Sequence, residues 1–297
     1  MSYDLEKFEG ISVWTRKGQR APHKPLLLLI ALGRLQQGEN PQMPFVDIEP
    51  QLRKLLVEFG PTRQSYHPEY PFWALQQDGL WVLKSEQPII LRKGSSNPSK
   101  GELIKRHASG MLEPSIIEAF KSKPELVTGA AKQLLSAHFP ESLHQDIANA
   151  VGINLNDSQA SASRKARDPK FRKEVLIAYE YKCALCGFDM RIGSVTIGLE
   201  AAHIKWHQAG GADMPSNGLA LCSIHHKLLD LGAYTILEDC RIQVSEHVHG
   251  GAGFNEILLS HHGKHLKPPQ RRSQEPDILN LIWHQKEVFK TKGREFN

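Results

Sequence analysis

The sequence predicts an α+β protein of two domains: a mainly helical N-terminal domain with a small β-hairpin, and a zinc-stapled C-terminal domain. An apolar run over 26–32 follows Pro25 and suits a buried helix. Asp78-Gly79 separates two segments rich in apolar and aromatic residues, as the turn of a β-hairpin does. In the second half, two short-spaced pairs of cysteine and histidine residues are typical of a zinc site. A length of 297 residues suits two domains.

The N-terminal domain is expected to begin with helices. An amphipathic segment covers 5–14, and a second helix runs from Pro25 to about Leu35. The second helix is apolar nearly all round, so we expect it to be buried. Another helix is predicted to open at Pro50, because proline suits the first turn and leucines follow at helical spacing. Gly60-Pro61 ends it.

The predicted hairpin joins an aromatic-rich strand over 66–75 to a return strand over 80–83. A basic loop over 92–100 follows. Three further helices are expected, at 101–109, 114–121 and 124–149. Residues 152–168 are polar and rich in serine and alanine, which indicates a linker between a domain over 1–151 and a domain over 169–297.

The C-terminal domain is expected to open with a basic amphipathic helix at Pro169. Leu199 to Ile204 is predicted to be a short apolar strand, and Ser223 to Leu231 a helix that Gly232 ends. The remaining predicted elements are a hairpin, a loop and a final helix, at 233–245, 246–275 and 277–290.

Two half-sites of knuckle spacing predict a structural zinc ion. Cys183-x-x-Cys186 and Cys222-x-x-His225 together supply a Cys3His ligand set. His226 is an alternative fourth ligand, but the spacing favours His225. The alternative interpretation is that these are ordinary surface histidines in a histidine-rich region. Cys240 is expected to be a spare thiol.

A second group of residues suits proton transfer from water beside a bound divalent cation. His203 stands near the end of the predicted strand, and a neutral imidazole takes a proton from water near neutral pH. His226 and Asp230 are four residues apart on a predicted helix, so they share a face and suit one hard divalent cation.

The order His203, Asn217, His226, preceded by the cysteine knuckle, resembles the HNH motif of the ββα-metal nucleases over about residues 169–245. The resemblance implies that His203 is the general base and that Asn217 braces the loop and positions His203. It also implies that His226 with Asp230 holds Mg²⁺ or Mn²⁺. One position departs from the pattern: Ala202 stands where many HNH enzymes have a metal ligand. Glu200, two residues earlier, is a weaker candidate ligand.

The first domain resembles the sulfur-binding domain of phosphorothioate-dependent restriction endonucleases, through Ala21-Pro-His-Lys-Pro25 with its leucine run and Tyr70-Pro-Phe-Trp-Ala-Leu75. The resemblance implies an apolar sulfur pocket formed by Tyr70, Pro71 and Ala74. It implies DNA contacts from Arg20, His23, Lys24, Arg92 and Lys93. The alternative interpretations are a core strand at 70–75 and solvated charge at Arg92 and Lys93.

Composition permits these interpretations. A net charge of +5 is compatible with nucleic-acid binding. Three of four cysteines in a zinc site suit a reducing cytoplasm. No signal peptide is recognisable at the N-terminus, and no apolar run is long enough to cross a bilayer.

The expected function is therefore a modification-dependent endonuclease that recognises phosphorothioated double-stranded DNA and cuts nearby, using structural Zn²⁺ and catalytic Mg²⁺ or Mn²⁺. A homodimer would supply two sites for a double-strand break. One alternative is an HNH enzyme that recognises another mark, such as a methylated base held between Trp73 and Trp81. The other is a zinc-stapled DNA-binding protein that does not cut.

Overall fold

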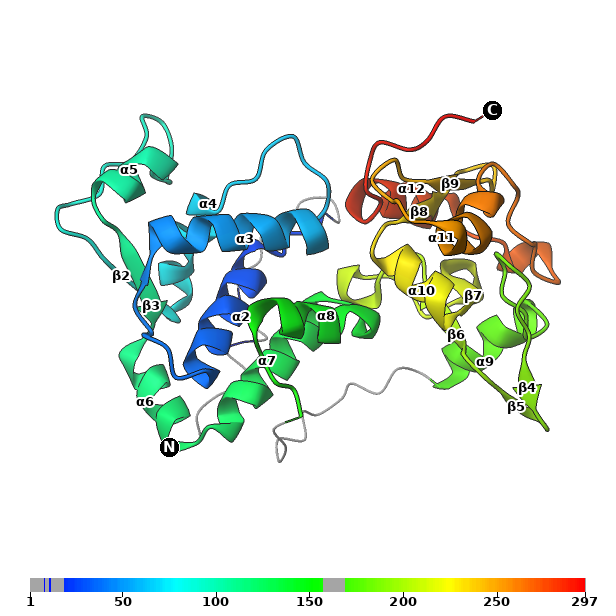
Figure 1. Cartoon of the computed structure of the whole chain (residues 1–297), viewed down its shortest axis with the longest axis horizontal. Helices are drawn as coiled ribbons and strands as arrows, with labels where there is room; N and C mark the ends of the chain where they lie inside the picture. Colours follow the sequence, from blue (N-terminus) through cyan, green and yellow to red (C-terminus); the bar gives the residue numbers. More distant parts are fainter. Residues whose placement is uncertain (1–7, 9–10, 12–18, 157–168, 297) are drawn as a thin grey trace. The chain divides into compact units, whose positions relative to one another are not determined.

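The computed structural model describes Phe8, Ile11 and residues 19–156 and 169–296. Their contacts divide the chain into two compact units, one over residues 20–156 and one over residues 169–296 (Figure 1). Most of the predicted linker lies outside the described residues, so the domain boundaries stay a prediction. The predicted amphipathic segment over 5–14 also lies outside them, apart from Phe8 and Ile11.

Helix α2 (His23–Gln36) forms the centre of the first unit, and all its residues from Pro25 to Gly33 are buried, as predicted. At Gly33 the end of α8 comes so close that a Cβ atom would lie 2.0 Å from the carbonyl oxygen of Val151. The helices that pack against α2 are α3 (Phe45–Phe59), α4 (Glu69–Ala74), α7 (Glu125–His138) and α8 (Glu141–Val151).

The predicted start of α3 at Pro50 is wrong, because the helix begins at Phe45 and contains Pro50. Proline has no N–H to donate to the carbonyl four residues earlier, so it is usually confined to a first turn. That earlier residue is Val46, which is 55% exposed, so water can satisfy its carbonyl. The predicted end at Gly60 is correct.

The predicted strand over 66–75 is also wrong. Glu69–Ala74 form α4, and a 3-10 turn over Leu75–Asp78 continues it to Gly79, whose φ is +68°. Pro68 and Pro71 lie before and within the first turn, where helical residues need no N–H partner. Phe72 and Leu75, three residues apart, are both buried, so the apolar pattern here follows a helix.

A three-stranded antiparallel sheet takes the place of the predicted hairpin. Its order is β1 (Met43–Pro44), β3 (Ser109–Leu112), β2 (Trp81–Lys84). Strand β3 falls where the predicted helix over 101–109 should end, since α5 covers only Lys100–Lys105. Gly110 in β3 leaves room for the indole of Trp81, because a Cβ atom at position 110 would lie only 2.4 Å from that ring.

Helix α6 (Pro114–Ser122) agrees with its prediction, but the helix predicted over 124–149 is two helices, α7 and α8. Pro140 separates them. The ring of a proline disfavours helical geometry at the preceding residue, and Phe139 is extended, with φ −137° and ψ 146°.

The second unit is built on an antiparallel ribbon of β6 (Leu199–His203) and β7 (Gly218–Cys222), in which His203 is paired with Gly218. Helices α9 (Pro169–Ala178) and α10 (Ser223–Asp230) pack against this ribbon. The predicted strand and the predicted helix before Gly232 are therefore confirmed. Gly232, with φ +74°, follows the end of α10.

The predicted hairpin and final helix of this unit are also confirmed, while the predicted loop contains one short α-helix, α11, and two 3-10 turns. The remaining elements are β4 (Arg191–Ile192), β5 (Val195–Thr196), β8 (Tyr234–Ile236), β9 (Ile242–Val244), α11 (Ala252–Ile257) and α12 (Ile278–Glu287). The core of the unit lies where the ribbon, α9, α10 and the β8–β9 hairpin meet.

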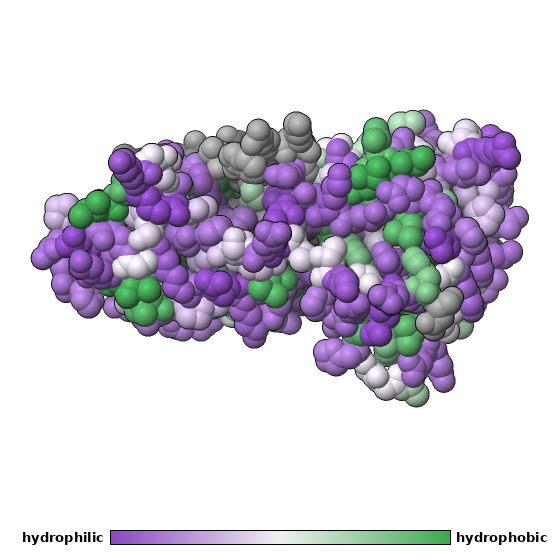
Figure 2. All heavy atoms as spheres, turned by 90° about the horizontal axis from the view of Figure 1, so that it is seen from above, coloured by the Kyte–Doolittle hydropathy of each residue, from purple (hydrophilic) through white to green (hydrophobic). Residues whose placement is uncertain are grey.

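Figure 2 shows one face of the molecule, which is mostly hydrophilic, with hydrophobic side chains in separate patches. Across the described part of the chain, no helix is both long enough and apolar enough to cross a bilayer.

Candidate functional site

Four side chains gather where the cysteine knuckle meets the start of α10. One ligand atom from each of Cys183, Cys186, Cys222 and His225 lies within 4.8 Å of the others. The Nδ1 atom of His225 is 3.1 Å from the Cys222 sulfur and 3.6 Å from the Cys183 sulfur. Tetrahedral Zn²⁺ with bonds of about 2.0–2.3 Å needs ligand atoms about 3.3–3.8 Å apart.

The chemistry of this cluster also suits Zn²⁺. Hydrogen bonds from Cys186 and Cys222 hold the pKa of the Cys183 thiol well below its usual range, while the same contact with Cys183 raises the pKa of Cys222. Ionisation of one thiol therefore disfavours ionisation of its neighbour, and a bound cation would offset this repulsion. His225 Nε2 donates to the carbonyl oxygen of Ile257 at 2.7 Å, which leaves Nδ1 to bind metal. The four residues therefore form a site that could hold zinc.

His203 lies at the end of β6 and is only 8% exposed. Its ring stacks on Phe171 of α9, with centroids 4.0 Å apart and planes 12° apart. Its Nε2 atom is 2.7 Å from Oδ1 of Asp213, in the loop between β6 and β7. The ring is therefore fixed on one face by an aromatic side chain and at one nitrogen by a carboxylate.

Asn217 is buried just before β7 and closes this loop. Its side-chain oxygen accepts a hydrogen bond from the Lys205 N–H at 2.9 Å. Its Nδ2 donates to the carbonyl oxygens of Lys205 and Ala212, both at 3.0 Å. Asn217 thus joins the residue two positions after His203 to the residue just before Asp213.

His226 on α10 lies between two carboxylates. Its Nδ1 is 2.6 Å from Oε2 of Glu200, and its Nε2 is 3.2 Å from Oδ2 of Asp230. Burial lowers the pKa of His226, but Asp230 and then Glu200 raise it more strongly, to about 9. The Asp230 side chain is 2% exposed, whereas that of Glu200 is 46% exposed.

The nuclease-motif residues thus form two groups on the ribbon. Successive strand residues face opposite sides. His203 faces α9, because it stacks on Phe171 and its cross-strand partner Gly218 also faces Phe171 and Val175. Glu200 reaches His226 on α10 instead. The structure brings His203 together with Asn217 through Asp213, and His226 together with Asp230 and Glu200.

In the first unit, Tyr70 and Ala74 are half-buried on one face of α4, and Pro71 is buried. The His67 ring stacks on Tyr70, with centroids 4.6 Å apart. Arg92 donates to the Tyr70 hydroxyl at 2.9 Å, and its guanidinium lies 5.2 Å from the ring centroid. Trp73 Nε1 donates to the Ser96 carbonyl oxygen at 3.0 Å, so the basic loop is attached to α4.

The other basic residues predicted to contact DNA have different surroundings. Lys24 forms an ion pair with Asp78 at 2.6 Å, and Arg20 donates to the Phe59 carbonyl oxygen at 2.9 Å. His23 is half-buried, and burial, followed by the charges of Arg63 and His67, lowers its pKa to about 4. Lys93 is exposed.

Three residues in these groups were missed or given little weight by the sequence interpretation: Asp213, Glu200 and His67. Asp213 had one sequence signal, its position in a glycine-rich loop between His203 and Asn217. The sequence signal for Glu200 was its position on the same predicted strand as His203, the candidate base. His67 lies three residues before Tyr70, just ahead of α4, and a turn in which the Tyr70 N–H donates to the His67 carbonyl oxygen at 3.1 Å brings the two residues together.

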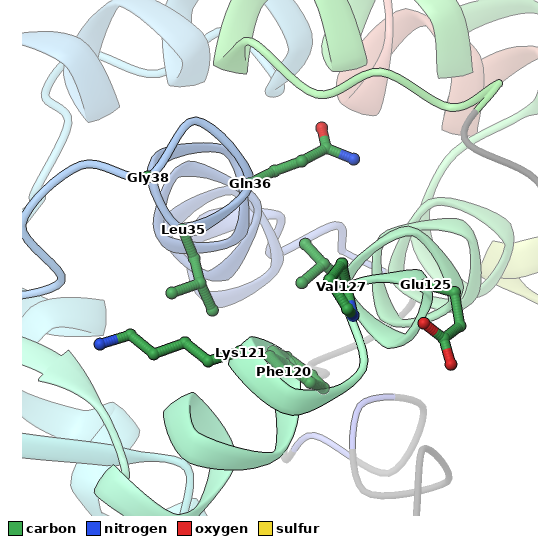
Figure 3. Close-up of a pocket in the computed structure, with 8 residues that line it drawn as sticks. Leu35, Gln36, Gly38, Phe120, Lys121, Glu125 and Val127 are labelled. Atoms are coloured by element: carbon green, nitrogen blue, oxygen red, sulfur yellow. The ribbon is translucent and has the colours of Figure 1, made fainter.

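A pocket of about 490 Å³ opens elsewhere in the first unit, between the end of α2 and the start of α7 (Figure 3). The side chains of Leu35 and Val127 line it together with Lys121 and Glu125. None of the predicted site residues lines it.

Comparisons with solved structures found similar chains at low identity. The sulfur-binding and SRA domains of ScoMcrA, complexed with phosphorothioated DNA, share 23% identity at a TM-score of 0.47, covering 53% of this chain and 49% of that chain. The sulfur-binding domain of SprMcrA, in a similar complex, shares 20% identity at a TM-score of 0.43, covering 50% and 91%. The chain thus spans about half the length of the ScoMcrA structure. No curated protein matches the chain.

Family models identify both units. A model described as a ScoMcrA-like DNA sulfur-binding domain matches residues 4–156, which is more than half of the chain. A model of HNH endonucleases matches residues 183–237. The chain therefore belongs to the family of proteins with a ScoMcrA-like DNA sulfur-binding domain, followed here by an HNH endonuclease domain.

Proposed function

We propose that this protein is a phosphorothioate-dependent DNA endonuclease, whose first unit binds sulfur-modified DNA and whose second unit hydrolyses phosphodiester bonds nearby. The observation that carries the proposal is the joining in one chain of a DNA sulfur-binding domain at 4–156 and an HNH domain at 183–237. Such an enzyme would serve to restrict modified foreign DNA in the cytoplasm.

The face of α4 that carries Tyr70 and Ala74 supports sulfur recognition. Sulfur is larger and more polarisable than oxygen and accepts hydrogen bonds more weakly, so a ring, a proline and a methyl group suit it. An ordinary phosphate oxygen there would lose water without gaining a donor, at a cost of about 1–3 kcal/mol. Arg92, held at the edge of Tyr70, is available for the phosphate charge. In this proposal His23, Lys24, Arg20 and Lys93 contribute to DNA binding around the pocket.

The second unit offers the groups that hydrolysis needs. His203 is the proposed general base, and Asn217 holds the loop that fixes it. The proposed ligands of the divalent ion are one ring nitrogen of His226 and the carboxylate that faces that same nitrogen. Exposure favours the Glu200 side, since DNA can reach it and Asp230 is buried. Bound there, Mg²⁺ or Mn²⁺ would neutralise charge on the phosphate. Cys183, Cys186, Cys222 and His225 hold the proposed structural Zn²⁺.

The two alternative functions have less support. A cage for a methylated base would need Trp73 and Trp81, but Trp81 is 3% exposed and packs edge-on against Phe72 in the core. A non-cleaving zinc protein would have no need of a carboxylate on His203 or of two on His226.

One HNH site cuts one strand, so we further propose that two copies act together when both strands are broken. A dimer is not required for binding the mark. Paired action predicts that the rate of double-strand cutting rises more steeply than linearly with protein concentration, whereas nicking alone at saturation would count against it.

The direct test of the nuclease assignment compares cleavage of one phosphorothioated duplex by the wild-type protein and by His203→Ala, with Mg²⁺ or Mn²⁺ added to the reaction. We expect the wild type to cut and the variant to lose at least about 100-fold in rate, a typical contribution of a general base. Binding should be unchanged, because the two functions lie in separate units. Cutting by the variant at the wild-type rate would remove His203 as the base.

A further inference from the structure

Asp213 is outside the HNH triple of histidine, asparagine and histidine, yet its carboxylate lies within hydrogen-bond distance of the proposed base. Its Oδ1 is 2.7 Å from His203 Nε2, and its Oδ2 is 4.0 Å from Nε2 of His207. The Asp213 side chain is 26% exposed, so the contact is partly shielded from water.

This contact favours one tautomer of His203 over the other. An ionised carboxylate only accepts hydrogen bonds, so an Nε2–H donor suits this contact, and in the neutral ring the lone pair is then on Nδ1. The nitrogen able to take a proton from water is then Nδ1. An asparagine at position 213 would lose this selectivity, because its amide offers a donor as well as an acceptor.

The loop holds Asp213 from both sides. Asn217 Nδ2 donates to the carbonyl oxygen of Ala212 at 3.0 Å, and the Asn217 N–H donates to that of Met214 at 2.8 Å. Two residues earlier, a Cβ atom on Gly211 would come within 1.8 Å of the Lys205 carbonyl oxygen, so only glycine fits this turn. Asn217 therefore fixes the peptide groups that flank Asp213.

The face of the imidazole is fixed as well. Phe171 stacks on it almost in parallel, which resists rotation of the ring about its Cβ–Cγ bond. The aspartate and the phenylalanine together restrain the orientation of the His203 ring and favour one tautomer.

We propose that Asp213 is the positioning residue of the proposed endonuclease. It holds His203 in the Nε2–H tautomer, with Nδ1 directed to the attacking water, and Asn217 acts mainly by holding Asp213. This inference rests on the proposed nuclease function, and it adds a residue that the HNH triple does not include.

The test combines kinetics with a measurement that does not depend on activity. Single-turnover cleavage of phosphorothioated DNA is compared among wild type, Asp213→Asn, Asp213→Glu and the control Asp239→Asn, an exposed aspartate paired with Arg241. Wrong-tautomer variants of a comparable histidine–aspartate pair lose about 10⁴-fold. We expect Asp213→Asn to lose about 10²- to 10⁴-fold in rate, with DNA affinity within about twofold of wild type. Asp213→Glu should retain part of the wild-type rate, and the control Asp239→Asn should retain all of it.

The tautomer is read from the ¹⁵N shifts of the His203 ring, assigned by comparison with His203→Gln. In the wild-type protein the expected result is a protonated Nε2 and an unprotonated Nδ1. A protonated Nδ1 overturns the proposal whatever the kinetics. So does an Asp213→Asn variant that cuts within about twofold of wild type.

In a His203→Ala background, Asp213→Asn should cause no further loss of rate, because Asp213 acts only through the His203 ring. A second full loss would contradict this. If the wild type does not cut at all, the nuclease function fails, while the ¹⁵N result still decides the role of Asp213.

Discussion

His226 has a carboxylate against each of its two ring nitrogens, so in the proposed metal site one carboxylate would share the ion with the ring and the other would orient the ring. Asp230 is buried and on the same helix, which suits an orienting role. Glu200 is on the neighbouring strand and partly exposed, which suits a ligand that DNA phosphate can approach.

This arrangement predicts that Glu200→Gln weakens binding of Mn²⁺ to the zinc-loaded protein by about 10-fold or more, as measured by calorimetry. Asp230→Asn should weaken it less and should also lower the melting temperature, since it leaves a buried imidazole with a poorer partner. Glu238→Gln, in an exposed turn, is the control. If Asp230→Asn abolished Mn²⁺ binding while Glu200→Gln retained it, the two roles would be reversed.

At the scale of single residues, the sequence predicts contacts between residues that are close along the chain or that follow a spacing rule. His226 and Asp230 meet as the helical spacing requires, and the four zinc-ligand candidates gather as their two knuckles predict. Asp213 could not be predicted to touch His203, because it lies ten positions further along the chain in a loop whose closure depends on Asn217. Glu200 was given little weight because alternation along a strand does not say how far a glutamate reaches.

At the scale of single elements, α7 ends in a histidine that predicts an acid-sensitive fold. Burial lowers the pKa of His138 from its ordinary value of 6.5 to about 4. Its Nε2 is buried and has no hydrogen-bond partner among residues 19–156 and 169–296. Above pH 6.5 neither the folded nor the unfolded chain is protonated here. Between pH 6.5 and 4 the unfolded chain binds a proton at His138 that the folded chain does not bind. The free energy of unfolding therefore falls as the pH is lowered through this range.

We therefore expect His138→Gln to reduce the loss of unfolding free energy between pH 7 and pH 4.5 by about 2 kcal/mol, as determined from denaturant unfolding of the first unit. His249→Gln, which removes an exposed histidine, should leave the pH dependence of that transition as it is in wild type. Equal pH dependence in wild type and His138→Gln would show that His138 is not responsible.

The Cys3His cluster joins the cysteine knuckle to α10, so removing one of the proposed zinc ligands should affect the whole second unit. Structural zinc contributes about 10–16 kcal/mol to the folding of small zinc peptides, so Cys222→Ser should lose zinc and unfold this unit. The first unit should keep its own melting transition. The matched control is Cys240→Ser, which changes the one cysteine outside the cluster. Zinc content and thermal melting measure both effects, and a full complement of zinc in Cys222→Ser would rule out Cys222 as a ligand.

The elements that the sequence predicted well are those with a clear apolar pattern. The leucine run predicts the buried helix α2, the apolar run over 199–204 predicts β6, and alternating residues predict β8 and β9. The errors cluster at prolines. Pro50 lies inside a helix, Pro71 lies in the first turn of α4 instead of in a strand, and Pro140 divides a predicted helix in two. Proline fixes the local backbone but does not by itself say on which side of it a helix lies.

On the scale of the whole molecule, the proposal assigns recognition and cutting to different units. The sequence indicated this division through its polar, serine-rich segment and through motifs that fall on either side of it. The face formed by Tyr70, Ala74 and Arg92 was less accessible to sequence reasoning, because the residues come from a helix that was predicted to be a strand and from a loop about twenty residues later.

The central claim is that sulfur in the DNA backbone controls cutting, and one comparison tests it most directly. Wild type and Ala74→Asp are each given duplexes of one sequence with and without a phosphorothioate, at one salt concentration, and binding and cleavage are measured. For wild type we expect sulfur to raise affinity about 5- to 150-fold and to raise cutting with it. For Ala74→Asp, which adds a charge in the pocket, affinity should fall to the salt-dependent level of ordinary DNA, with a ratio near one. A wild-type ratio near one would contradict the account.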